Sequence, residues 1–144
     1  MMKKMKCCIV LVVCLLATVV KTTAQVTVDA KLDSAGIFIG QRIGVTLEVS
    51  ADANKEVQLP EWDSLQQIVP GLEFVKAEKA DTSFLNEGKR IMLSRRYYFT
   101  SFDSALYLIP EMNVKVEGED YKSKRLALKV FTFDIDTLHA DSIF

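Results

Sequence analysis

Alternation of apolar and polar residues is the main pattern along this chain, and it predicts β-strands. The clearest case is the segment 43–49, where Ile43, Val45, Leu47 and Val49 alternate with small or polar residues. A period of two places these four side chains on one face of a strand, whereas a helix would scatter them around its circumference. Three of the four are β-branched and favour extended backbone. We therefore predict a half-buried strand here.

The stretch from residue 89 to 116 organises the remainder of the chain. Alternating residues up to Phe99 predict one strand, the segment Ser101–Ser104 predicts a turn, and Leu106 to Ile109 predict a second strand that ends at Pro110. We expect these two strands to pair. Two paired strands with one apolar face are not stable alone in water, so other strands must cover them.

Similar but shorter alternations predict further strands at 26–32, 72–75, 112–116 and 126–130. Turns are expected at 33–36, 70–71 and 117–120, and one helical turn is compatible with 64–69. The polar segments 51–55 and 79–88 are expected to lack strands. About seven short strands separated by turn signals predict an all-β fold, an immunoglobulin-like antiparallel β-sandwich. Its expected interior contains Val45, Leu47, Leu93, Tyr97, Leu126 and Leu128.

The first 24 residues have the pattern of a secretory signal peptide. Three lysines precede an apolar run of 14 residues, Cys7–Val20, and a short polar segment ends at Ala24. As a helix the run would rise only about 21 Å, less than the roughly 30 Å hydrocarbon core of a membrane. We therefore predict cleavage after Ala24 and export to the periplasm. An uncleaved membrane anchor is the alternative, and lipidation at Cys14 fits less well because Val13 precedes it.

Removal of this segment changes the composition of the mature chain. All three cysteines lie within it, so residues 25–144 contain neither a disulfide nor a free thiol. The full chain has 18 basic and 19 acidic side chains, and four of the lysines precede Gln25, which leaves a net charge of about −5. A mildly acidic chain without a basic run argues against binding to nucleic acid, whose phosphates require a positive surface. The length suits one domain, predicted over 25–131.

The segment 132–144 is predicted to be an acidic linker or tail. It contains Asp134, Asp136, His139 and Asp141, residue types that bind metals. A metal site needs ligands that converge on a rigid frame, and a chain end does not supply one, so we predict no metal here. The apolar ending at Phe144 leads us to expect a fragment of a longer protein.

Enzyme classes find little support. His139 is the only histidine, so the predicted domain offers no histidine base for a serine or cysteine triad. Carboxylates lie in predicted turns, and no glycine-rich loop precedes a helix that would hold a phosphate. We predict a protein with no catalytic residues and no cofactor.

Four aromatic or basic positions leave structural and functional alternatives open. Tyr107 resembles the tyrosine corner of immunoglobulin-type domains, whose hydroxyl bonds to nearby backbone, or is an ordinary core tyrosine. Trp62 is either a residue between the sheets or an exposed anchor, and its neighbours favour a partly exposed loop. Arg95 and Arg96 form either a small recognition patch with Tyr97 and Tyr98 or, as we favour, a solvated face with one arginine at a strand end.

The order of these motifs resembles the N-terminal domain of BatD, a protein of the aerotolerance operon of Bacteroidota and other bacteria. The resemblance rests on segments that span nearly all of the mature chain: Val26–Leu32, Ile39–Gln41, Val45–Val49, Leu59–Pro60, Gly71–Val75, Tyr97–Thr100, Ala105–Pro110 and Ser123–Val130.

Such a resemblance implies an exported protein of immunoglobulin-like domains with a transmembrane helix near its C-terminus. It also implies partners encoded nearby, namely von Willebrand A-domain proteins and a MoxR-type ATPase, and no catalytic residues. This chain departs from that layout because it ends without an anchoring helix. The leading hypothesis is a non-catalytic interaction module of a Bat-type envelope complex for stress or oxygen tolerance. The alternative is a carbohydrate-binding or adhesin-like domain that uses Trp62, Tyr98 or Tyr121, provided that these aromatics share one exposed face.

Overall fold

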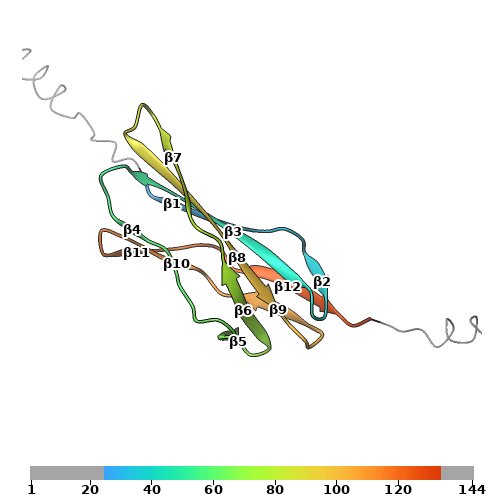
Figure 1. Ribbon diagram of the computed structural model, residues 1–144. Coiled ribbons are helices and arrows are strands. Elements are labelled where there is room, and N and C mark those ends of the chain that lie inside the picture. The colour runs from blue at the N-terminus through green and yellow to red at the C-terminus, as the bar shows by residue number, and fades with distance from the viewer. Residues whose placement is uncertain (1–24, 134–144) are drawn as a thin grey trace, which may run out of the picture.

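The computed structural model describes residues 25–133, which form twelve β-strands and no helix (Figure 1). The predicted signal peptide, 1–24, and residues 134–144 of the predicted tail lie outside the described residues. The all-β fold is as predicted, and every strand pair among the described residues is antiparallel except the pair of β2 with β12.

One layer of the fold is a six-stranded sheet in the order β1-β3-β8-β6-β5, with β7 also paired to β8. Its strands are β1 (Thr27–Leu32), β3 (Arg42–Asp52), β5 (Gln67–Val69), β6 (Leu72–Ala77), β7 (Asp81–Leu85) and β8 (Arg90–Thr100). β3 and β8 pair along their full 11 residues, from Arg42 opposite Thr100 to Asp52 opposite Arg90. These two strands form the centre of the layer.

On its other side β8 has two successive neighbours. β7 pairs with the first part of β8, from Arg90 to Ser94, and β6 pairs with the last part, from Tyr97 to Thr100. Arg95 and Arg96 therefore lie where one neighbour replaces the other.

Two three-stranded sheets face the inner side of the large sheet: β2-β12-β9 and β11-β10-β4. Their strands are β2 (Gly36–Phe38), β4 (Val57–Gln58), β9 (Ala105–Ile109), β10 (Asn113–Val116), β11 (Glu119–Lys122) and β12 (Leu126–Phe131). β9 and β10 follow one another along the chain, as do β11 and β12, so together they form one long antiparallel ribbon. Where the ribbon is interrupted, the Met112 N–H donates to Ser123 Oγ at 2.9 Å, and the Ser123 N–H donates to the Met112 carbonyl at 3.0 Å.

Buried side chains from all three sheets meet in one core. It contains Ile43, Val45, Leu47 and Val49 of β3, Tyr97 and Phe99 of β8, Tyr107 and Ile109 of β9, Val114 and Val116 of β10, and Leu128 and Val130 of β12. Of the six residues predicted to share the interior, four are fully buried there, and Leu93 and Leu126 are half-buried against the same core. The predicted interior is confirmed.

The predicted pairing of the strand before Ser101–Ser104 with the strand after it is wrong. β8 belongs to the large sheet, whereas β9 pairs with β12 in the opposite layer, from Ile109 opposite Leu126 to Ala105 opposite Val130. The intervening turn crosses between the layers instead of closing a hairpin. Alternation reports which face of a strand is buried and not which strand lies beside it.

The number of strands was also underestimated. The segment 79–88, predicted to be a gap, contains β7, all five of whose side chains are exposed, so that no alternation marks it. The helical turn expected within 64–69 is instead a turn followed by β5. β11 begins inside the predicted turn at 117–120, and β2 runs parallel to β12 although only antiparallel pairs were predicted.

Candidate functional site

The outer face of the β2-β12-β9 sheet carries several exposed apolar side chains beside Lys129, which lies opposite Leu106, and nothing in the described structure covers it. Leu106 and Leu108 of β9 are 66% and 56% exposed, while the intervening Tyr107 is buried in the core. Phe38 of β2, Phe131 of β12 and the following Phe133 are also exposed. An antiparallel sheet with one solvated face normally has polar residues there. We call the five exposed residues Phe38, Leu106, Leu108, Phe131 and Phe133 the apolar face.

Three aromatic rings of the apolar face pack on one another. Phe38 and Phe133 stack with ring centres 4.6 Å apart and planes 10° apart, and Phe38 lies 6.2 Å from Phe131 in a tilted arrangement. Gly36 makes room for the Phe131 ring, because a Cβ atom at this position would lie 2.8 Å from Phe131 Cε2. Lys129 Nζ lies 5.0 Å from the centre of the Phe131 ring and is the charged group beside the cluster.

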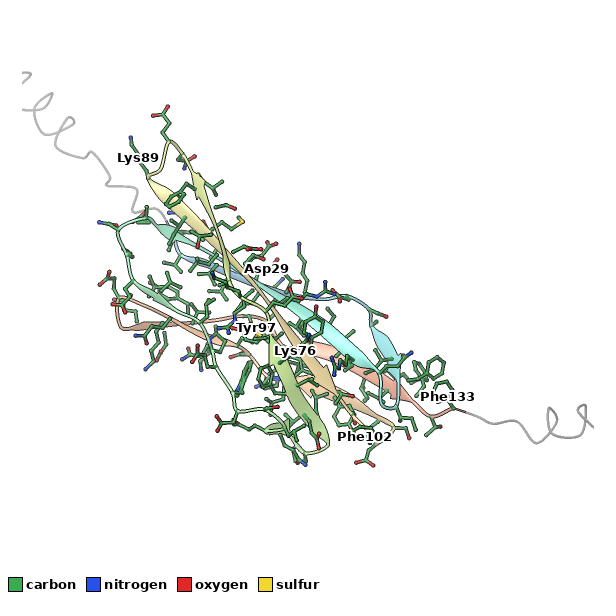
Figure 2. The ribbon with its side chains drawn as sticks, in the orientation of Figure 1. Asp29, Lys76, Lys89, Tyr97, Phe102 and Phe133 are labelled. Carbon is green, nitrogen blue, oxygen red and sulfur yellow. The ribbon has the colours of Figure 1, made fainter. Side chains whose placement is uncertain are left out.

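Phe102, 68% exposed, follows β8 and extends the apolar character of this end of the molecule. Figure 2 shows Phe102 and Phe133 near one end of the molecule and Lys89 near the other. Phe102 and Phe133 therefore lie toward the same end of the sandwich.

A tyrosine corner anchors β9, the strand that carries two residues of the apolar face. The Tyr107 hydroxyl donates to the carbonyl oxygen of Asp103 at 3.0 Å and lies 2.9 Å from Oγ of the buried Ser101. Ser101 Oγ in turn accepts the Asp103 N–H at 3.2 Å. The predicted bond from Tyr107 to nearby backbone is confirmed. It ties the crossing between layers to the strand that follows.

The favoured interpretation of Arg95 and Arg96 holds only in part: Arg96 lies on the exposed outer face of β8, but Arg95 is in the middle of the strand and points to the inner face, not at a strand end. Arg96 is on the outer face, where it pairs with Asp33 and lies 5.2 Å from the centre of the Tyr98 ring. Its hydrogen bond with Asp33 raises the pKa of Arg96 above its ordinary value. Arg95 is on the inner face, 5.4 Å from the centre of the Tyr97 ring. The four residues therefore do not form a single recognition patch.

Trp62 lies in the loop between β4 and β5, half-buried, as predicted. Its ring makes edge contacts with Tyr97 at 5.3 Å and with Phe99 at 5.8 Å, and a tilted contact with Phe74 at 5.5 Å. The Tyr97 hydroxyl donates to the Pro60 carbonyl at 2.8 Å, and burial raises the pKa of Tyr97 to about 12. This segment is thus fastened to the inner side of β8.

The aromatic residues on which the carbohydrate hypothesis depends do not share one face. Trp62 packs against the core, whereas Tyr98 lies on the outer face of β8 and donates to Glu78 Oε1 at 2.6 Å. Tyr121 belongs to β11, in the other layer, and packs partly against the core. The arrangement gives that alternative no platform.

Residues 25–133 contain no group of three or more histidine, cysteine, aspartate or glutamate side chains placed to hold a metal ion. The tail residues Asp134, Asp136, His139 and Asp141 lie outside this range. In the same part of the chain no helix has the length and apolar character needed to cross a membrane. Comparison with protein-family models, with curated proteins and with solved structures finds no match to the chain.

Proposed function

We propose that this chain is a non-catalytic protein-interaction module of the bacterial cell envelope and that the apolar face is its contact surface. The observation that carries the proposal is that the five side chains of the apolar face are exposed on one side of a single sheet. Exposed apolar patches on soluble proteins often mark sites of protein interaction. Aromatic residues are also enriched at the centres of protein interfaces.

The proposal further makes the chain an immunoglobulin-like domain of a BatD-like protein, exported by its N-terminal segment. The order of its sequence motifs supports this assignment, as does a β-sandwich with a tyrosine corner at Tyr107. The proposed partners are A-domain proteins encoded in the same operon, and the complex would serve stress or oxygen tolerance together with a MoxR-type ATPase.

A pull-down from envelope extracts tests the proposal. The tagged full chain is expected to recover an A-domain protein, and the double variant Leu106→Glu/Leu108→Glu is expected to lose it. Both leucines point outward, so the variant should keep its fold, which circular dichroism checks.

Phe84→Glu is the matched control, because Phe84 is equally exposed, at 67%, but lies on β7 in the other layer. It should capture the partner as the wild type does. The proposal fails if no A-domain protein is recovered with the wild-type chain, or if the leucine variant and the control capture equal amounts.

A further inference from the structure

A groove separates the inner side of β8 from the segment 57–61 and is distinct from the apolar face. It has a volume of about 530 Å³ and is open to solvent along one side. Val57, Leu59 and Leu93 supply apolar walls, and Glu61 and Arg95 supply charges. An adjoining hollow of about 200 Å³ shares Glu61 and Arg95 and extends to Trp62.

The groove exists because strand edges border it. β4 is the last strand of its sheet, and it pairs only with β10. Across the groove, the strand paired with β8 changes from β7 to β6. Ala80, which precedes β7, lines this wall of the groove. Edge strands retain unpaired backbone groups, and extended peptides commonly bind by pairing with such edges.

Arg95 is an unusual residue for the inner face of β8, where its neighbours in the alternation are Leu93 and Tyr97. Its side chain is only 21% exposed. Its Nε–H donates to the Glu78 carbonyl at 2.9 Å, and its guanidinium lies over the Tyr97 ring. These two contacts hold the plane of the guanidinium while its Nη groups remain on the groove side.

The partner of those Nη groups is weakly held. Arg95 Nη1 lies 3.6 Å from Glu61 Oε1, which is beyond ordinary hydrogen-bond distance. The Glu61 side chain is 81% exposed and so is held by few contacts. The Arg95 side chain is otherwise held by the hydrogen bond from Nε to Glu78 and by its interaction with the Tyr97 side chain. A guanidinium largely removed from water gains most from a carboxylate bound through two parallel hydrogen bonds.

We propose that this groove binds an extended segment of a partner protein, with an acidic side chain of the partner on Arg95. The apolar residues that flank the acid pack against Val57, Leu59 and Leu93, and the segment runs beside the free edge of β4. Glu61 occupies the position of the incoming carboxylate loosely in the free protein and is displaced by it. The loop that carries Glu61 is already fastened by the hydrogen bond from Tyr97 to Pro60, so the wall of the groove is formed before binding.

Selection from a phage-displayed library of random seven-residue peptides tests the inference, with protein purified after expression of the full chain. Enriched peptides should carry one aspartate or glutamate flanked by apolar residues. Replacing that acid by its amide should weaken binding at least tenfold. Binding is measured by the fluorescence of Trp62, the only tryptophan of the chain, which lines the adjoining hollow.

Three variants sharpen the test. Arg95→Met removes the charge but keeps an unbranched stem, and should weaken binding at least tenfold. Glu61→Gln removes the competing carboxylate and should tighten binding severalfold. Arg125→Met is the matched control, since Arg125 is exposed between β11 and β12, and it should bind as the wild type does.

The inference is overturned if no acidic peptide is enriched, if the acid and amide peptides bind equally, or if Glu61→Gln weakens binding. If Arg95→Met fails to fold, the comparison of the acid and amide peptides and the Glu61→Gln variant still test the inference. The inference does not rest on the apolar face, so the Leu106→Glu/Leu108→Glu variant should retain peptide binding.

Discussion

Replacing Gly71 by alanine tests how the turn between β5 and β6 is coupled to the tyrosine corner. Gly71 has a φ of +88°, in the left-handed region that side chains other than glycine rarely adopt. A Cβ atom at this position would lie 2.7 Å from Tyr107 Oη and 3.1 Å from Tyr107 Cε1. Tyr107 cannot simply move away, because Asp103 and Ser101 hold its hydroxyl.

The expected loss of stability has two parts. The left-handed backbone costs about 1 to 2 kcal/mol for an alanine. Displacing the Tyr107 hydroxyl weakens up to two hydrogen bonds, each worth about 1 kcal/mol. Gly71→Ala should therefore lower the free energy of unfolding by about 2 to 4 kcal/mol.

Gly118 provides the control for the backbone part. It has a φ of +79°, and no atom lies within 4 Å of a Cβ built on it. Gly118→Ala should therefore cost only the backbone part, about 1 to 2 kcal/mol. Urea unfolding of both variants measures the difference.

A double-mutant cycle with Tyr107→Phe isolates the contact. In the phenylalanine background the hydroxyl is gone, so Gly71→Ala should cost nearly as little as Gly118→Ala. Equal losses for the two glycine variants in the wild-type background would refute the coupling between the turn and the corner.

Three further predictions concern β8 and its surroundings. The pKa of Tyr97 is raised to about 12, against about 10 for a tyrosine in the unfolded chain. The hydroxyl therefore loses its proton at a lower pH in the unfolded chain than in the folded one. The free energy of unfolding should fall by up to about 3 kcal/mol as the pH rises from 10 to 12. Urea titrations at pH 9 and 11.5 should show a smaller fall for Tyr97→Phe, and an equal fall would contradict the assignment. In Gly44→Ala the new methyl group would meet the side chains of Arg96 and Asp33. Because both side chains are partly exposed and can shift, the free energy of unfolding should change by less than about 1 kcal/mol. A loss above about 2 kcal/mol would show that these side chains cannot shift. Trp62→Ala should destabilise by about 2 kcal/mol in urea, less than a fully buried tryptophan, and a negligible loss would mean that its three ring contacts add no stability.

The elements predictable from sequence were those with one buried and one solvated face. β3 was expected at 43–49 and extends from Arg42 to Asp52, because the alternation that marks its core continues into weaker residues at either end. β7 had no such signal, since its stability comes from pairing with β8 and not from burial of its own side chains. The partner of β9 was unpredictable for a related reason: pairing depends on the path of the turn at Ser101, which no local period records.

The candidate sites show the same limit. The run from Ala105 to Ile109 was predicted as a strand, but nothing in it showed that Leu106 and Leu108 would stay uncovered. Arg95 interrupts an apolar alternation and was for that reason interpreted as solvated. In the structure it keeps its inward position because the opposite layer ends at β4 and leaves a groove there. The one sequence feature that pointed to the groove was a charged residue, Arg95, at an inward position of an otherwise apolar alternation.

The placement of β1 and β12 bears on how this protein responds to tension. Figure 1 shows the two described chain ends at opposite ends of the long axis, one leading from β1 in the large sheet and the other from β12 in the facing layer. Interstrand hydrogen bonds run perpendicular to the strands, so a stretching force along that axis must shear whole ladders at once instead of unzipping them one rung at a time. A force applied at the two described ends therefore loads the ladders of β1 and β12 in shear.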